Sequence, residues 1–191
     1  TNESETTYNL INDYSTYDNN GTSGAGDPEI APLWVRDCVV GSCYDFPYNK
    51  SINLGNSPSL NITNNITIMF WINFHDLEYS LNQFPRILDK NSGTAGYGCI
   101  FNNVSKIVSC QARNDSNFQI TATDTTAVTV DTWVHFASTY TMNDGANGLF
   151  KLYRNGTAIR NSSVQVDTEI GRSATNVTVG GNAPASATSI N

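Results

Sequence analysis

Apolar and polar residues alternate between positions 66 and 74, and this pattern constrains the fold more than any other feature of the sequence. The even positions are apolar: Ile66, Ile68, Phe70, Ile72 and Phe74. The odd positions hold Thr67, Met69, Trp71 and Asn73. Successive side chains of a β-strand point to opposite faces, so a period of two predicts a strand with one face toward a core. No segment keeps the 3.6-residue period of an amphipathic helix over more than two turns, which predicts an all-β domain.

Further strand-like segments recur along the chain, separated by residues that favour turns. We expect them at 51–54, 85–90, 97–102, 106–112, 117–123, 126–130, 132–141, 149–154, 157–160 and 175–180. Asn155 and Gly156 stand between two of these segments, and both central residues of a type I′ turn need a positive φ, so this pair predicts a tight hairpin. About a dozen short strands in one domain predict an antiparallel sandwich of two sheets.

The chain has 191 residues, which fits one domain spanning 1–191 and allows a sizeable core to be buried. Neither an internal repeat nor a linker divides it. Residues 1–30 are the least regular part, and turn-forming polar residues between 14 and 28 predict a long loop. Residues 181–191 are small and polar and predict a tail.

The four cysteines lie in two close pairs: Cys38 and Cys43, and Cys99 and Cys110. A metal site is the rival interpretation to disulfides, but neither pair has CxxC spacing and neither histidine lies near a pair. Among the three possible connectivities we expect the local one. Pairing Cys99 with Cys110 in a hairpin also pairs Phe101 with Val108, so one register serves both the bridge and the strands.

The sequence is dense in acceptor triplets for N-linked glycans. Ten Asn-x-Ser/Thr triplets without a central proline occur where about five would arise by chance from this content of Asn, Ser and Thr. This density predicts export through a glycosylating route, to the cell surface or the extracellular space. The acceptor residues are Asn2, Asn20, Asn49, Asn61, Asn65, Asn103, Asn114, Asn155, Asn161 and Asn176.

The composition argues against two classes of partner. Only 14% of the residues are charged and the net charge is −7, with the few Lys and Arg scattered along the chain. A nucleic-acid surface needs clustered basic residues, so we expect no nucleic-acid partner. No apolar run reaches the roughly 18 residues of a membrane span, so we expect no span in this chain. No signal peptide is recognisable, and Thr1 is expected to be a mature or trimmed start.

Four stretches of the chain carry a resemblance to a known family. They are 18–22, then 44–46 with 51–55 and 57–60, then 65–68 leading to Trp71 and Ile72, and last 133–137 with Tyr140 and 152–156. With these stretches the chain resembles the laminin G-like group of concanavalin A-like jelly rolls, from about residue 8 to residue 180. The resemblance implies a two-sheet antiparallel jelly roll of the kind found in extracellular domains.

The end of the chain departs from this family pattern. Members usually continue past the point that matches Val179, Gly180 and Gly181 into a closing strand with an acidic residue. Here residues 183–191 are small and polar. Either the chain is a fragment, or its sandwich lacks a strand that another chain supplies by strand addition. Both alternatives stay open.

The residues argue against catalysis. Glycoside hydrolysis on this fold needs two carboxylates that face each other across the sugar. The chain has only five Glu and no Glu-x-Asp-x-Glu strand. Its two histidines, His75 and His135, accompany no Ser or Cys nucleophile motif. We therefore expect no enzyme activity.

The resemblance also implies a calcium site, because sandwiches of this family often bind one ion through the early polar loop and an acidic residue of the closing strand. Asp13, Asp18 and Asn20 offer oxygen ligands of the kind that calcium prefers. Asn20 is also a glycan acceptor, and we favour the alternative that these side chains form hydrogen bonds within the loop. Calcium is the one cofactor that the sequence suggests.

A lectin site stacks an aromatic face on a sugar ring beside amide and hydroxyl groups. Trp71 lies on the less apolar face of its strand with Asn73, and the same alternation continues to His75, so these three residues are the candidate sugar-binding groove. The family usually has Trp at this position whether or not a ligand binds. We therefore favour core packing for Trp71.

Two functional classes remain. The first is a non-enzymatic, heavily N-glycosylated structural or adhesive surface protein that self-associates by strand addition into a fibre, appendage or envelope. The second is a carbohydrate-binding, lectin-like module of a larger secreted protein. The number of glycan acceptors favours the first class.

Overall fold

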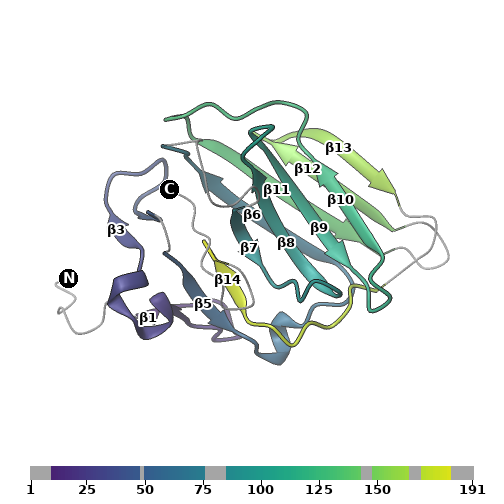
Figure 1. The fold of residues 1–191 in the computed structure, drawn as a ribbon, viewed down its shortest axis with the longest axis horizontal. Coiled ribbons are helices and arrows are strands. Elements are labelled where there is room, and N and C mark those ends of the chain that lie inside the picture. The colour runs from purple at the N-terminus through teal and green to yellow at the C-terminus, as the bar shows by residue number, and fades with distance from the viewer. Residues whose placement is uncertain (1–9, 48–49, 76–84, 143–147, 164–168, 182–191) are drawn as a thin grey trace.

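The computed structural model describes residues 10–47, 50–75, 85–142, 148–163 and 169–181. Within them, two antiparallel sheets pack face to face, and the connections contain short 3-10 helices at Gly24–Gly26, Pro28–Ile30 and Pro58–Leu60 (Figure 1). The prediction of an all-β, two-sheet sandwich is confirmed.

The larger sheet has eight described strands in the order β1-β2-β5-β14-β7-β8-β9-β10. Their bounds are Leu10–Ile11 (β1), Gly21–Ser23 (β2), Ile52–Gly55 (β5), Val177–Val179 (β14), Arg86–Asp89 (β7), Gly96–Asn102 (β8), Ile107–Arg113 (β9) and Gln119–Thr123 (β10). The smaller sheet has four in the order β13-β12-β11-β6, with bounds Thr157–Ser163, Leu149–Arg154, Val134–Thr141 and Ile66–Ile72. Among the described strands, β6 therefore forms one edge of the smaller sheet.

Strand β6 follows the alternation in the sequence. Ile66 and Ile68 are buried, whereas Met69 on the opposite face is 67% exposed. Beyond the strand, Phe74 is also buried, and its ring centre lies 4.3 Å from that of Phe101 in the larger sheet. Each apolar side chain of this size contributes about 1.5–3 kcal/mol when it leaves water, so this alternating face helps to hold the sheets together.

The main core covers only part of the larger sheet. Its buried side chains come from β7 to β10 on one side and from β6, β11 and β12 on the other. At one end of the sandwich, β10 of the larger sheet contacts both β12 and β13 of the smaller sheet. Strands β1, β2, β5 and β14 continue the larger sheet beyond β6, and no described strand of the smaller sheet lies opposite them (Figure 1).

The β8–β9 hairpin has the predicted register. Cys99 pairs with Cys110 across the two strands and forms a disulfide, and Phe101 pairs with Val108. All four side chains are fully buried. The second disulfide joins Cys38 to Cys43, so the local connectivity is confirmed.

Residues 126–130 form no strand, so that prediction is wrong. The N–H of Thr126 donates to Oδ1 of Asp124 at 3.0 Å. The carbonyl oxygens of Thr126 and Ala127 accept hydrogen bonds from the Arg154 guanidinium. Side chains thus satisfy backbone groups that a sheet would otherwise pair, and β-propensity alone does not decide the outcome.

The N-terminal part is more regular than predicted, because β1 and β2 both lie within residues 1–30 and β2 interrupts the expected loop at 14–28. Strand β2 is too short and polar to show an alternating pattern. A Cβ on its Gly21 would lie only 2.7 Å from Cδ2 of Leu54. Close packing against β5 therefore defines this strand, and a glycine allows that approach.

Candidate functional site

A cleft of about 480 Å³ opens along β6. One wall is the short hairpin of β3 (Leu33–Val35) and β4 (Cys43–Asp45), and the floor includes Ile52 and Ile87 of the larger sheet. The four consecutive residues 70–73 all line the cleft. Because neighbouring residues of a strand point to opposite faces, a cleft that touches all four runs along the backbone edge of β6.

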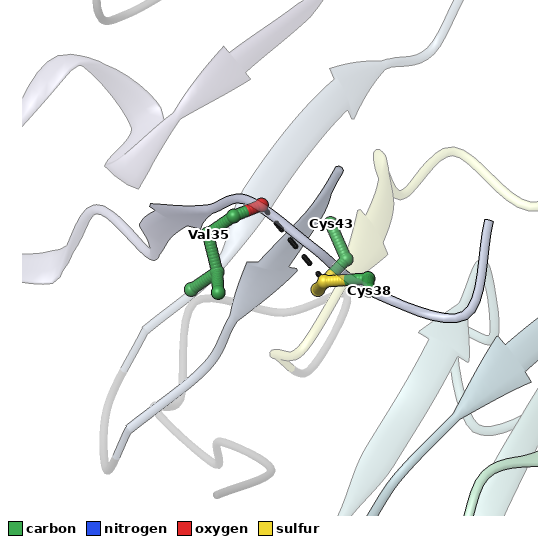
Figure 2. Close-up of a disulfide and its surroundings, with 3 residues drawn as sticks. All are labelled: Val35, Cys38 and Cys43. Atoms are coloured by element: carbon green, nitrogen blue, oxygen red, sulfur yellow. Dashed lines mark hydrogen bonds between the residues drawn. A yellow bond between two sulfur atoms is a disulfide. The ribbon is translucent and has the colours of Figure 1, made fainter. Parts of the chain in front are cut away.

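The hairpin wall is closed by the disulfide between Cys38 and Cys43, both of which line the cleft. Figure 2 shows this bridge beside Val35, whose carbonyl oxygen lies 3.8 Å from Sγ of Cys38. The disulfide therefore fixes the turn that places Tyr44 and Asp45 on the cleft wall.

Trp71 lies at the mouth of this cleft and is 45% exposed, so the expectation that it packs in the core is wrong. It stands opposite His135 in the β6–β11 pairing, and the two ring centres are 5.2 Å apart. The physical reason is the position of the side chain on the same face of β6 as Met69, which is 67% exposed. The pair forms an exposed aromatic surface, which we call the Trp71–His135 platform.

The other two predicted groove residues, Asn73 and His75, line the same cleft. Oδ1 of Asn73 is buried and has no hydrogen-bond partner in the part of the chain that the structure describes. An unpaired buried acceptor costs about 1–3 kcal/mol, so this oxygen favours a site for a donor from water or a ligand. Nδ1 of His75 lies 2.8 Å from Oδ1 of Asp131, which fixes the orientation of the exposed ring.

Sequence reasoning missed several residues of the cleft. Trp133 lines it from the segment just before β11, while Asp37 and Asp45 bring carboxylates from the β3–β4 hairpin. The hairpin strands have three residues each, too few for a periodic pattern, and they lie far from β6 in the sequence. The one signal in the sequence is the aromatic content of that segment, which includes Trp34, Tyr44 and Phe46.

The structure brings the predicted calcium ligands Asp13, Asp18 and Asn20 together in one loop, where hydrogen bonds connect them. The Asp13 carboxylate accepts hydrogen bonds from Oγ and N–H of Ser15 and from N–H of Asn19, and these bonds lower the pKa of Asp13. Asn20 accepts from the N–H of Asp13 and donates to Asp18. Among the described residues, no cluster of three or more His, Cys, Asp or Glu side chains is arranged to hold a metal. Calcium binding here stays a prediction.

The glycan acceptors occupy different environments. Asn2 and Asn49 lie outside the described residues. Asn103 is only 9% exposed in the turn between β8 and β9, whereas Asn65, Asn155 and Asn161 are exposed. Glycosylation itself stays a prediction at all ten positions.

Residues 46–191 match the family described as the concanavalin A-like lectin/glucanases superfamily, which is more than half of the chain. The chain belongs to this superfamily. The match confirms the laminin G-like resemblance, and together with the two disulfides it fits an extracellular protein. None of the helices in the described ranges has the length and apolar character needed to cross a membrane. No curated protein gives a significant match to the sequence.

Solved structures share the fold of this superfamily member. The receptor-binding domain of botulinum neurotoxin mosaic serotype C/D has a TM-score of 0.63 and 12% identity, over 89% of this chain and 41% of the other. The ligand-binding domain of serotype D, in complex with N-acetylneuraminic acid, has a TM-score of 0.55 and 12% identity, over 82% and 44%. The CBM40 of the Ruminococcus gnavus IT-sialidase, bound to α2,3-sialyllactose, has a TM-score of 0.54 and 18% identity, over 78% and 79%. The chain thus spans less than half of the neurotoxin domains, and these identities show a common fold.

Proposed function

We propose that this domain binds carbohydrate without catalysis, at the cleft beside Trp71. The observation that carries the proposal is the meeting of Trp71, Asn73, His75 and Trp133 at one cleft of a lectin-like sandwich. The volume of the cleft, about 480 Å³, lies within the range of small-ligand sites. The sialyllactose-bound CBM40 and the N-acetylneuraminic acid complex are proteins of the same fold, which supports a sugar-binding role.

The residues of the cleft supply both kinds of contact that a sugar site requires, which are aromatic stacking and hydrogen bonding. The exposed face of Trp71 stacks on the apolar face of a pyranose ring, and Trp133 offers a second apolar contact. The amide of Asn73 and the imidazole of His75 supply hydrogen-bonding groups for hydroxyls. Asp45 adds acceptors from the hairpin wall.

The charge of the cleft favours a neutral sugar. Asp37 and Asp45 both line it, and no Lys or Arg is found among its described lining residues. A carboxylated sugar such as a sialic acid would meet like charge there, whereas neutral hydroxyls can donate to the carboxylates. We therefore infer that the ligand is a neutral oligosaccharide, unlike the ligands named for the two similar structures.

Affinity measurements on Trp variants test this function. We expect the wild-type domain to bind members of a panel of neutral oligosaccharides, and Trp71→Ala to weaken binding about tenfold or more. Trp34→Ala is the matched control, because Trp34 is also exposed, at 55% against 45% for Trp71, and does not line the cleft. Circular dichroism checks that all variants fold. Absence of binding across the panel, or equal losses in both variants, would overturn the proposal, and release of reducing sugar would overturn its non-catalytic part.

A structural role is the second candidate, and the edge that β6 forms among the described strands favours it. Residues 70–73 present that edge to the cleft, with apolar residues of the larger sheet behind it. An edge with free backbone groups and an apolar slot beside it is the geometry that accepts an added strand. A glycosylated surface protein that assembles in this way would form polymers. Electron microscopy of natively purified protein distinguishes ordered filaments, as this candidate requires, from dispersed particles.

A further inference from the structure

The acceptor Asn155 holds an unusual position beside the Trp71–His135 platform. It lies in the turn between β12 and β13, is exposed, and has a φ of 50°, as a type I′ turn requires. Its N–H donates to the carbonyl oxygen of His135 at 2.8 Å, and its Oδ1 accepts from the N–H of His135 at 2.9 Å. Two hydrogen bonds therefore tie Asn155 to the residue that contacts Trp71.

The orientation of the Asn155 amide suits modification. Oδ1 is held by His135, while Nδ2, the atom that carries an N-linked glycan, has no hydrogen-bond partner among the described residues. Attachment at Nδ2 leaves Oδ1 and its hydrogen bond intact, so the folded turn accepts the change. Asn103 provides the contrast, because its side chain is buried.

The turn is also close to the platform. Strand β11 lies between β12 and β6, and neighbouring strands are about 4.8 Å apart, so Asn155 lies about two strand spacings from Trp71. Trp71 and His135 both face the outside of the smaller sheet. A branched glycan on Asn155 is long enough to lie over this surface.

We propose that Asn155 carries an N-linked glycan that partly covers the Trp71–His135 platform and weakens the binding of free oligosaccharide. The transfer uses a lipid-linked oligosaccharide diphosphate as donor. A bond forms between C1 of the first sugar and Nδ2, the bond between C1 and the diphosphate oxygen breaks, and the amide proton leaves with the lipid diphosphate. The effect on affinity rests on the proposed sugar-binding function, whereas the coverage of Trp71 does not.

The chain offers a variant that removes the glycan and leaves the asparagine in place. Thr157→Ala destroys the Asn-Gly-Thr triplet but keeps the Asn155 side chain and both of its hydrogen bonds to His135. Ser116→Ala is the matched control. It removes the Asn114 triplet in the turn between β9 and β10 of the other sheet. It leaves in place the hydrogen bonds that Oδ1 of Asn114 accepts from the N–H groups of residue 116 and Phe118.

The test compares wild type, Thr157→Ala and Ser116→Ala secreted from a eukaryotic host. Glycopeptide mass spectrometry measures occupancy of Asn155, and hydroxyl-radical footprinting measures oxidation of Trp71 without any ligand. Because glycans are bulky, we expect Thr157→Ala to lose one glycan and to raise Trp71 oxidation about two-fold, and Ser116→Ala to leave this rate unchanged.

Affinity for a neutral oligosaccharide is the third readout, and it should rise in Thr157→Ala alone. An unmodified Asn155, or equal Trp71 oxidation in all three proteins, would overturn the inference. If Trp71 oxidation rises as expected but no protein binds any sugar, the proposed function fails while the coverage of Trp71 by the glycan stands.

Discussion

The carboxylate of Asp124 lies 2.9 Å from Nη1 of Arg154, and the Asp124 side chain is fully buried. The same guanidinium donates to the carbonyl oxygens of Thr126 and Ala127 and lies 5.8 Å from the centre of the Phe136 ring. One side chain thus ties the irregular segment after β10 to strands β11 and β12 of the opposite sheet. Loss of this contact would leave a charge inside the sandwich without its partner.

We expect Arg154→Ala to lower the free energy of unfolding by about 3–5 kcal/mol, because it leaves the buried Asp124 carboxylate unpaired. Urea denaturation measures the change. Arg160→Ala, exposed on the neighbouring β13, is the control and should change stability by less than about 0.5 kcal/mol. Equal effects of the two variants would show that the ion pair does not hold the sheets together.

The two disulfides should differ in their resistance to reduction. Cys99 and Cys110 are fully buried in the β8–β9 hairpin, whereas Cys38 and Cys43 are partly exposed on the wall of the cleft. A reductant thiolate must reach the sulfur, so we expect the Cys38–Cys43 bond to open first while the sandwich stays folded. Timed alkylation followed by peptide mass spectrometry gives the order. Earlier labelling of Cys99 and Cys110 would contradict the protection of this pair by burial.

Tyr97 should make stability sensitive to alkaline pH. Burial raises the pKa of Tyr97 from its ordinary value of 10.0 to about 12, and its hydroxyl donates to the carbonyl oxygen of Leu60 at 3.0 Å. Between these pH values the folded protein keeps the phenolic proton that the unfolded chain releases. The unfolded state then binds fewer protons, so stability falls as the pH rises through this window.

Tyr97→Phe is expected to remove this part of the pH dependence. At neutral pH the variant should lose about 1 kcal/mol, because the Leu60 carbonyl loses its donor. Urea denaturation compares the two proteins near pH 8, below the ordinary pKa of 10.0, and near pH 11, between 10.0 and the raised pKa of about 12. If the wild type and Tyr97→Phe lose the same free energy of unfolding between pH 8 and pH 11, Tyr97 does not cause the loss.

The long strands could be predicted from the sequence, and the short ones could not. Strand β6 and the β8–β9 hairpin are long enough to show alternation and a shared register with a disulfide. Strands β1 to β4 have two or three residues each, so they carry no period and depend on packing between distant segments. Residues 126–130 have strand-forming composition, but Arg154 binds their backbone.

One part of the candidate site could also be predicted from the alternation in β6. The alternation that defines β6 also placed Trp71, Asn73 and His75 on one side, and all three line the cleft. The assignment of Trp71 to the core failed because a sequence does not reveal which sheet face is left uncovered. Tyr44 and Asp45 belong to the cleft through the β3–β4 hairpin, and no local pattern connects them with β6.

The central claim is that a neutral oligosaccharide binds at the cleft beside Trp71, and an NMR titration observed at the three Trp indole N–H groups tests it most directly. Trp71 and Trp133 line the cleft, whereas Trp34 is exposed outside it. We predict saturable shifts of the Trp71 and Trp133 signals with an unchanged Trp34 signal. Shifts confined to Trp34, or no shift with any neutral oligosaccharide at millimolar concentration, would contradict the account.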